Sequence, residues 1–504
     1  MKHNPPYAKD SRGAGSYRIF FAVALVMLAL GLLYVYNLGG WLIADDEGTD
    51  LYEIWRISEG DVPGVDLITE QLLVFLLGGV GLGLLSDFNV VVLRGASAVL
   101  VLGSAWLVFL LGREMWGPRA GFLGMVFYLL NSMVYAQARL FRPDPWMLAF
   151  SVLGLYLFVL AQTRVKRWYV SLAGVMYGIG TLCKLFGVLP LGGCLLFLTY
   201  QVIADRTSFR RFLGDVTLLL VPFLLISMGG TLAFYPPGSA YYNYVLGQHW
   251  QLGSQRGLTL RLGKGLVVVA LFLRHNLAFL LAIPLLHRLA VSRSPGERVL
   301  AWQVPSGLAY FVLSRPIYER YWLYLVPVFG LILGYLVDRL VGWVESRGGS
   351  WGRFQAILVG VLAVGLGVAQ SVPAILQHPW RREEDTLALA AYIAAHTAPG
   401  ESVLSDYASL NFHARRPSVY QASIIAGGRI GGGFVTGADL IAEIEARDVR
   451  MVILHVSGGS PPPHQLVKLH DFDEFYTYLN QHFCRVDTFN RAGQLLEIYQ
   501  TCSE

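Results

Sequence analysis

Three consecutive carboxylates, Asp45, Asp46 and Glu47, follow directly on a run of apolar residues. At the edge of a lipid layer, adjacent carboxylates repel one another and lose part of their hydration, so we expect a raised pKa in at least one of them. Such a group suits a general base or a metal ligand. Helix capping is the simpler alternative, because a helix N-terminus offers free N–H groups and a positive dipole to carboxylates.

Two further acids follow, and their spacing favours the capping interpretation for them. Asp50 and Glu53, three apart, match a capping box at the start of a helix. Leu51, Ile54 and Trp55 fall on one face of that helix, which predicts a segment lying along the membrane surface. One cap needs only one side chain, so the three preceding acids stay open between a cap and a catalytic role.

A pair of arginines in "YAQARLFRPDPWM" provides groups of the opposite charge. Arg139 and Arg142 lie three apart between two apolar runs. Guanidinium groups bind phosphate oxygens in a bidentate way, so the pair is a candidate phosphate site. The alternative is that both side chains extend to lipid headgroups. The neighbouring Asp144 and Pro145 are typical of an N-cap and the first position of a helix.

Lys184 and Arg320 are further cations at the ends of apolar stretches. Lys184 is the only charge in "GTLCKLFGVLPLGG", and a lysine in lipid costs at least about 3 kcal/mol unless it is paired or hydrated. Phosphate binding and extension to the headgroups are its two interpretations. Arg320 and Tyr321 precede another apolar run. Arg320 is expected to hold a phosphate or to pair with a carboxylate, either one of the acidic loop or the adjacent Glu319.

The composition places these residues in a membrane protein. Of 504 residues, 55% are hydrophobic and 14% are charged, whereas soluble domains contain roughly 25% charged residues. A spanning helix needs about 20 mostly apolar residues. By this rule the sequence predicts about eleven spans, at residues 18–38, 89–112, 118–138, 145–163, 168–182, 185–203, 211–234, 264–287, 299–314, 321–343 and 354–376.

The distribution of arginine and lysine predicts the orientation of these spans. The basic N-terminus and the long first apolar run indicate an uncleaved signal anchor whose N-terminus is cytoplasmic. Each loop that is then expected inside carries basic residues, for example Arg164 and Arg167 after the fourth span. An odd number of spans places residues 378–504 outside the cell membrane. The assignment depends on splitting residues 168–203 into two short spans around Lys184.

The polar tail, residues 378–504, is expected to form a small α/β domain, because strand-like and helix-like segments alternate along it. A hairpin near Gly493 would set Cys484 opposite Cys502, so that either a disulfide or two free thiols is expected there. Four cysteines in the whole chain exclude a scaffold built on disulfides. The small net charge of +5 forms no basic tract, so nucleic acid is not expected as a partner.

The order of these motifs resembles one known family. A first span, the Asp46-Glu47 pair, a helix and then "EGDVPGVD" are similar to the polyprenyl-phosphate-sugar-dependent glycosyltransferases of C-type membrane fold. This family includes protein O-mannosyltransferases and lipid A aminoarabinose transferases. The resemblance covers about residues 18–376. Val65 stands where the family often has an aromatic residue before an aspartate, here Asp66.

The resemblance implies roles for the candidate residues. Asp46 corresponds to the presumed catalytic base, with Glu47 beside it, and Asp45 and Asp66 would support the loop or the acceptor. The donor's phosphate would be bound by the basic loop residues and one tyrosine, namely Arg139, Arg142, Lys184, Arg320 and Tyr321. No metal is required for a donor that its phosphate already activates, although Asp45, Asp46 and Glu47 together could bind a divalent cation.

The resulting prediction is a multi-pass glycosyltransferase of the cell (inner) membrane. It comprises a cytoplasmic N-terminus (1–17), a transmembrane domain (18–377) with a catalytic exterior loop at about 39–88, and an extracytoplasmic α/β domain (378–504). A polyprenyl-phosphate sugar would be its donor, and a protein, lipid or polysaccharide its acceptor. The alternatives are a transporter or lipid flippase, or a silent assembly subunit. Clustering of the charges on one face argues against the transporter, because a transport pathway runs across the bilayer.

Overall fold

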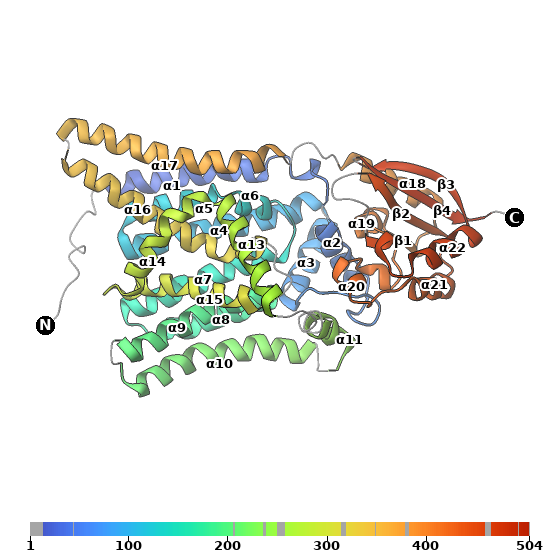
Figure 1. Ribbon diagram of the computed structural model, residues 1–504, viewed down its shortest axis with the longest axis horizontal. Coiled ribbons are helices and arrows are strands. Elements are labelled where there is room, and N and C mark those ends of the chain that lie inside the picture. The colour runs from blue at the N-terminus through green and yellow to red at the C-terminus, as the bar shows by residue number, and fades with distance from the viewer. Residues whose placement is uncertain are drawn as a thin grey trace.

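The computed structural model describes residues 14–43, 45–204, 207–234, 238–248, 258–313, 319–347, 349–377, 383–458, 465–491 and 493–502. The chain forms a long helical body and a smaller unit of helices and strands at one end of it (Figure 1). The described part of the chain begins with α1 (Ala14–Val35) at the far end of the body and ends at the outer end of the smaller unit. The helices α2 (Asp45–Ser58) and α3 (Leu73–Ser86) lie between these two parts.

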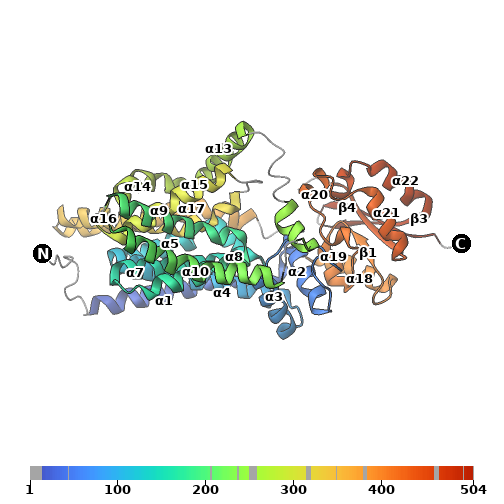
Figure 2. The ribbon, with the colours of Figure 1, turned by 90° about the horizontal axis from the view of Figure 1, so that it is seen from below.

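The helical body forms because long apolar runs can satisfy their backbone hydrogen bonds in lipid only as helices. Its helices lie side by side along the long axis of the molecule, and α13 leans away from the others (Figure 2). They are α1 (Ala14–Val35), α4 (Val90–Trp116), α5 (Pro118–Leu129), α6 (Ser132–Ala138), α7 (Pro143–Arg164), α8 (Trp168–Cys183), α9 (Leu189–Ala204), α10 (Phe209–Phe234), α13 (Leu258–His275), α14 (Ile283–Ala290), α15 (Pro295–Leu313), α16 (Val326–Arg347) and α17 (Gly349–Gln377).

Glycines allow the central helices to approach closely. A Cβ atom on Gly112 of α4 would lie 2.5 Å from the Cα atom of Gly121 of α5. A Cβ atom on Gly334 of α16 would lie 2.3 Å from the backbone nitrogen of Gly124, which is also on α5. Small residues at such crossings let helix backbones touch, which is how helices associate in lipid without a hydrophobic driving force. The order α4–α5–α16 at the centre of the body follows from these contacts.

Within the described residues, six helical segments are long and apolar enough to cross a membrane, or eight if each of two bent pairs counts as one span. The bent pairs are α5 with α6, at 65°, and the segment around α13 with α14, at 102°. The predicted spans at 168–182, 299–314 and 354–376 are the helices α8, α15 and α17. The predicted split at Lys184 is confirmed, since α8 ends at Cys183 and α9 begins at Leu189.

Ion pairs join neighbouring helices at the end of the body away from the smaller unit. Arg164 at the end of α7 contacts Glu114 of α4 at 2.7 Å, and Arg167 contacts Asp215 of α10 at 2.8 Å. These arginines belong to the loops predicted to be cytoplasmic. Interfacial pairs of this kind tie adjacent loops together at the headgroup level, where the charges stay partly hydrated.

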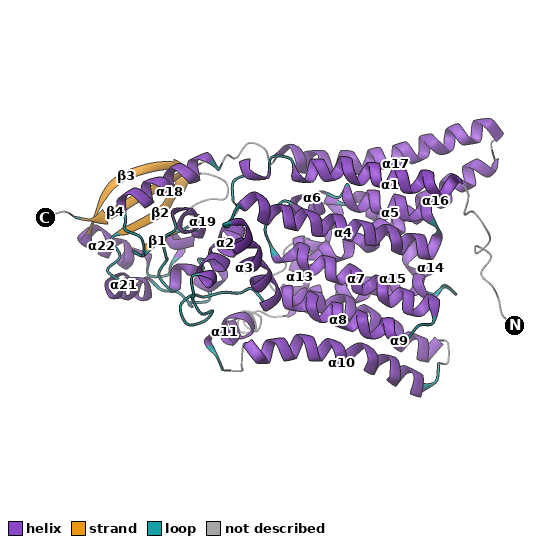
Figure 3. Ribbon diagram, turned by 180° about the vertical axis from the view of Figure 1, so that it is seen from behind, coloured by secondary structure: helices purple, strands orange, loops and turns teal. Residues whose placement is uncertain are grey.

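Two helices form a wedge between the body and the smaller unit (Figure 3). They are α2 (Asp45–Ser58) and α3 (Leu73–Ser86). Leu51 and Ile54 of α2 are fully buried in a cluster with Phe75 of α3 and Phe412 of the smaller unit. The predicted apolar face of this helix is therefore present, but it packs against protein. The prediction that it lies on the membrane surface is wrong. The capping-box prediction is wrong, because α2 begins at Asp45 and so places Asp50 inside the helix.

The smaller unit is built on a four-stranded sheet of order β1-β2-β4-β3, in which only the β1-β2 pair is parallel. Its strands are β1 (Val403–Ser405), β2 (Met451–Gly458), β3 (Phe483–Arg491) and β4 (Gln494–Thr501). The helices around the sheet are α18 (Glu384–His396), α19 (Ala408–Ala414), α20 (Gly427–Gly431), α21 (Gly437–Ala446) and α22 (Phe472–His482). This agrees with the mixed helix and strand content that the sequence predicts for the tail.

The β3-β4 hairpin turns at Gly493, whose φ of 85° lies in the left-handed region that glycine adopts readily. Its two ends are joined by a disulfide between Cys484 and Cys502, the two residues that the sequence places opposite each other. The other two cysteines, Cys183 and Cys194, are free and buried in the body. The disulfide fastens the edge strand β3 and the last residues of the chain to the sheet.

Replacing Cys484 and Cys502 with serine is expected to destabilise the smaller unit by about 3 kcal/mol, because the bond closes a loop of 18 residues in the unfolded chain. Thermal unfolding of the purified protein with and without reductant measures this. Reductant should lower the midpoint of the wild type and leave the double variant unchanged. An equal shift in both proteins would mean that the stabilisation does not come from this bond.

Candidate functional site

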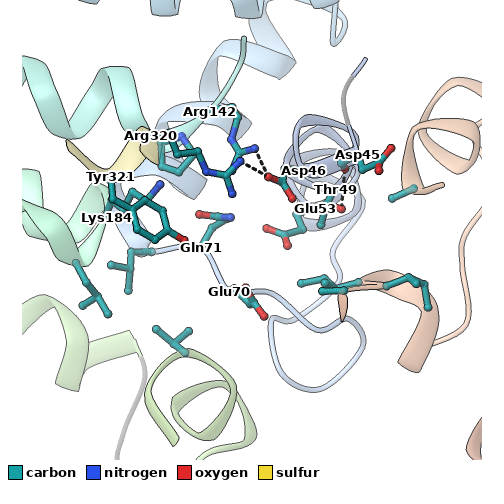
Figure 4. Close-up of a pocket in the computed structure, with 18 of the residues that line it drawn as sticks. Asp45, Asp46, Thr49, Glu53, Glu70, Gln71, Arg142, Lys184, Arg320 and Tyr321 are labelled. Carbon is teal, nitrogen blue, oxygen red and sulfur yellow. Dashed lines mark hydrogen bonds and ion pairs between the residues drawn. The ribbon is translucent and has the colours of Figure 1, made fainter. Parts of the chain in front are cut away.

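A cavity of about 270 Å³ lies where the body, the wedge and the smaller unit meet. The body contributes Arg142, Lys184, Phe186, Tyr310, Arg320 and Tyr321 to its wall, the wedge region contributes Asp45, Asp46, Thr49, Glu53, Glu70 and Gln71, and the smaller unit contributes Asp406, Tyr407, Ala422, Ile424 and Ile425. Figure 4 shows the cations on one side of this space and the carboxylates Glu53 and Glu70 on another. The cavity is therefore polarised, with a cationic wall on the side of the body.

Asp46 connects the wedge helix α2 to the cationic wall. Its Oδ2 atom accepts hydrogen bonds from Arg142 at 2.5 Å and from Arg320 at 2.7 Å (Figure 4). Burial raises the pKa of Asp46, but the two guanidinium groups outweigh this and hold the pKa well below its usual range. The raised pKa that the sequence predicts for the acidic run does not apply to this residue. Its side chain remains 49% exposed, so a bound molecule can reach the carboxylate.

Arg142 and Arg320 come from separate parts of the chain. Arg142 immediately precedes α7 and is largely buried, whereas Arg320 lies in the short 3-10 helix η5 (Glu319–Leu325) before α16. An arginine guanidinium has five donor N–H groups in a planar fork. Each arginine gives Asp46 one of these bonds, so a phosphate in the cavity would meet the same two guanidinium groups that hold Asp46.

Lys184 adds the third cation of this wall. It stands at the break between α8 and α9, and its Nζ atom lies 2.7 Å from both carboxylate oxygens of Asp144. The ammonium group also lies 5.2 Å from the ring centre of Tyr321 and 5.4 Å from that of Phe186. Asp144 is the second residue of α7 and not its N-cap. The predicted structural role of Asp144 therefore takes a different form, that of the counter-ion of Lys184.

Glu47 has a structural role that the sequence did not predict. Its side chain is completely buried and makes two hydrogen bonds with Arg94 of α4, at 2.8 and 2.7 Å. It also accepts a bond from the backbone N–H of Phe141 at 2.7 Å. Glu47 does not line the cavity. This carboxylate fixes the start of α2 to α4 and to the loop before α7, which positions the adjacent Asp46.

Two other predicted site residues also lie outside the cavity. Arg139 is 1% exposed, donates to the carbonyl oxygens of Leu33 and Tyr36, and lies 3.9 Å from the ring centre of Trp41. It thus caps the C-terminal end of α1, where carbonyl groups lack helical partners. Asp66 is exposed, and its carboxylate accepts a bond from Val62 within a turn of the loop.

Several residues that line or support the site were not singled out from the sequence. Arg94 is a lone charge near the start of a predicted span, and such a buried charge requires a partner, which is Glu47. Asp406 and Tyr407 directly follow β1, and side chains at the carboxyl end of a parallel strand commonly line a ligand crevice. The lone charge in an apolar run and the position directly after a strand could both have been recognised in the sequence. The apolar pair Ile424-Ile425 carried none.

The aromatic segment after α10 touches the cavity from another side. Tyr241 is buried and its hydroxyl donates to the carbonyl oxygen of Gln71. Tyr244 lies against Tyr420 of the smaller unit, and Val245 lines the cavity. Residues 235–237 and 249–253 of this aromatic segment lie outside the described residues.

No metal group forms from the acidic run. Among the described residues, no cluster of three or more histidine, cysteine, aspartate or glutamate side chains could hold a metal ion. Glu47 turns away to Arg94, so the three adjacent carboxylates that the sequence offered as a cation site do not converge. The residues present do not fit a metal bound by these three acids.

The fold is that of the C-type membrane glycosyltransferases, and residues 72–228 match the family model described as dolichyl-phosphate-mannose-protein mannosyltransferase. The structure of ArnT from Cupriavidus metallidurans bound to undecaprenyl phosphate has a TM-score of 0.69 at 16% identity and covers 96% of this chain and 98% of ArnT. The Archaeoglobus fulgidus oligosaccharyltransferase has a TM-score of 0.60 at 13% identity, covering 98% and 74% of the two chains. Arabinofuranosyltransferase AftD from Mycobacteria has a TM-score of 0.55 at 13% identity, covering 98% and 42%.

No curated protein matches the chain. The resemblance that the sequence indicated is confirmed by the family match and by the shared fold. With identities of 13 to 16%, these solved structures establish the fold of the chain.

Proposed function

We propose that the protein transfers a glycosyl group from a polyprenyl-phosphate sugar to an acceptor hydroxyl, with Asp46 as the base. The observation that carries this is the cationic wall formed by Arg142, Lys184 and Arg320 in one cavity, with Asp46 bonded to two of these cations. A phosphate is the ligand that such a set of donors binds best. The solved structure of ArnT, which has the same fold, contains undecaprenyl phosphate.

The reaction follows from the polarity of the cavity. The three cations would bind the donor's phosphate, whose negative charge grows as the bond between the anomeric carbon and the phosphate oxygen breaks. The acceptor hydroxyl attacks the anomeric carbon from the opposite face, which inverts the configuration. Its proton passes to the Asp46 carboxylate, and the electron pair of the broken bond leaves with the phosphate.

The donor itself would activate Asp46. In the free protein both arginines bond to this carboxylate and lower its pKa, which makes it a weak base. A phosphate that competes for the same N–H groups draws the arginines away, and the pKa of Asp46 rises toward its ordinary value. Asp46 thus becomes an effective base after the donor is bound, and we expect the donor to bind before the acceptor.

The apolar helices and the fold support a multi-pass protein of the cell membrane. We propose that the end of the body that carries the cavity and the smaller unit faces the outside, as the arginine and lysine distribution predicts. The donor lipid would then reach the cationic wall sideways from the outer leaflet. The smaller unit, which contributes Tyr407, Ile424 and Ile425 to the wall, would contact the acceptor.

Replacing Arg320 with glutamine is expected to weaken binding of a polyprenyl phosphate about 10- to 100-fold, which corresponds to one charge-assisted hydrogen-bonded contact. Arg320 is the suitable position because it is 30% exposed, so its removal leaves no buried charge without a partner. Arg485→Gln is the matched control, an exposed arginine on β3 paired with Glu497. Titration of the detergent-solubilised protein with the lipid measures both. Equal affinity for the two variants would remove Arg320 from the phosphate site.

A further inference from the structure

Behind the cationic wall lies a carboxylate that the reaction as described does not use. Asp50 follows Asp46 by four residues on α2, so both point to the same side of the helix. Its side chain is completely buried, and neither of its carboxylate oxygens has a hydrogen-bond partner. The nearest cation is Arg142, whose Nε atom lies 3.6 Å from Asp50 Oδ2 and also lacks a hydrogen-bond partner.

An ionised carboxylate left in this way would be costly, because a buried charge needs both a counter-ion and hydrogen bonds. The cost disappears if Asp50 carries a proton. The burial of the side chain raises the pKa of Asp50 well above its usual range; Arg142 acts against this and the negative charge of Asp46 adds to it. Both the contacts and the energetics therefore favour a neutral Asp50 in the free protein.

The proton on Asp50 determines the net charge of the residues around it. Three cations of the wall, Arg142, Arg320 and Lys184, are bonded to two carboxylates, Asp46 and Asp144. While Asp50 is neutral, this group of residues has one positive charge in excess, which would balance the single negative charge of one phosphodiester. Ionisation of Asp50 would cancel the excess and give Arg142 a second carboxylate partner.

We propose that Asp50 is a positioning residue that binds Arg142 only when Asp50 is ionised. The protein then binds a phosphodiester donor while Asp50 is protonated, and its affinity for the donor falls when Asp50 loses the proton. The inference rests on the proposed function, since it concerns the same phosphate site. It adds that donor affinity is controlled by pH through a residue that touches neither the sugar nor the reacting atoms.

Other groups near Asp50 do not offer the same control. Glu53, one turn further along α2, is also fully buried, its pKa is likewise raised by burial, and its Oε1 atom has no hydrogen-bond partner. Its Oε2 atom accepts a bond from Thr69 at 2.6 Å, and the charged groups that act on it are the acids Asp50 and Glu70, whereas Asp50 faces Arg142. Lys184 and Asp144 are paired with each other. Of the elements that pack on α2, helix α3 and the short 3-10 helix η6 (Gln421–Ser423) carry no titratable side chain. The histidine of α19, His413, is paired with Glu383.

The direction of the pH effect follows from the raised pKa. A group with a raised pKa is protonated at lower pH and ionises only as the pH passes that value, so donor affinity is full below the pKa of Asp50 and is lost above it. If binding requires the protonated form, affinity falls about tenfold per pH unit beyond the pKa. This loss lies on the alkaline side of the ordinary carboxyl range, where exposed aspartates are already ionised.

The test is titration of the wild type, Asp50→Asn and Glu59→Gln with a polyprenyl methyl phosphodiester from about pH 5 to about pH 9. This probe keeps one negative charge throughout. Asparagine matches the shape of neutral aspartate, so Asp50→Asn should bind as tightly as the wild type at low pH and keep that affinity at high pH. Glu59 is exposed at the end of the same helix segment, and Glu59→Gln should follow the wild type.

Each outcome separates this inference from the proposed function. No binding of the diester at any pH contradicts the proposed function. Binding whose pH dependence is absent in the wild type, or persists in Asp50→Asn, overturns the role of Asp50. Calorimetry of the wild type in two buffers of different ionisation enthalpy is a second measurement that needs no variant. Above the pKa of Asp50, diester binding should take up close to one proton, and zero uptake would contradict the inference.

Discussion

Asp46→Asn is expected to lower kcat for glycosyl transfer about 100- to 10,000-fold, the range that a positioned general base contributes. Donor binding should survive or become tighter, because the amide no longer competes as a charged partner for Arg142 and Arg320. The side chain is half exposed and sits on the cavity wall, so the folded structure should tolerate the change. Steady-state kinetics with donor and acceptor, together with donor titration, measure both effects.

Glu59→Gln is a matched control for this result, since it also neutralises a carboxylate of the same segment but lies exposed beyond the end of α2. It should leave kcat and KM at their wild-type values. A fall in donor affinity with unchanged kcat in Asp46→Asn would assign Asp46 to binding and would require another base. Full activity in Asp46→Asn would reduce the carboxylate to a helix cap.

Glu47→Ala is expected to cost about 3–5 kcal/mol of stability, because it leaves the guanidinium of Arg94 buried without its partner. Both side chains are 0% exposed and share two hydrogen bonds. The backbone N–H of Phe141 loses its acceptor as well. Since this loop continues into Arg142, the loss should also disturb the cationic wall. Thermal unfolding of the detergent-solubilised protein measures the change.

The double variant Glu47→Ala/Arg94→Met is the control for this prediction. Removing both charges leaves no uncompensated ion, so the double variant should be more stable than Glu47→Ala alone. The difference between the double variant and the sum of the single variants gives the coupling energy. A double variant as unstable as the sum would show that the two residues act independently and that the ion pair does not hold α2 in place.

The contrast between Asp46 and Glu47 illustrates what the sequence can and cannot predict. Adjacent residues of a helix point about 100° apart, so one of the two faces the cavity and the other faces α4. The sequence placed the acids beside the membrane but did not specify where α2 begins, because three adjacent acids fit several starting points. The start at Asp45 directs Glu47 to Arg94 and leaves Asp46 to the cavity.

The arginine pair differs from the acids in a similar way. Three residues apart on a continuous helix, Arg139 and Arg142 would share a face. Helix α6 ends at Ala138, however, and α7 begins at Pro143, so the backbone turns between the two side chains. Arg139 is directed to the end of α1, and Arg142 to the cavity. Lys184 and Arg320, at the ends of long apolar runs, both line the cavity, where Lys184 pairs with Asp144 and Arg320 with Asp46. A charge in such a position must find a partner near the headgroups.

The smaller unit contributes to the cavity in a way that the sequence did not reveal. Its mixed helix and strand pattern was readable from alternating segments, and so was the turn of the last hairpin. Which loops of the unit face the body depends on how its helix α19 docks on α2, through contacts such as Ser409 against Gly48. Docking of two preformed parts leaves no periodic signal in a sequence, so Tyr407 and Ile424 were not among the predicted residues.

The central claim is that this cavity transfers sugar from a lipid phosphate, and one measurement tests it directly. Purified protein in liposomes is given a panel of radiolabelled polyprenyl-phosphate sugars with candidate acceptors, and released polyprenyl phosphate and glycosylated acceptor are counted together. We expect equal amounts of both products with at least one donor, and at least about 100-fold less of both with Asp46→Asn. Donor that crosses the bilayer intact, with no release of polyprenyl phosphate, would contradict it and indicate a transporter.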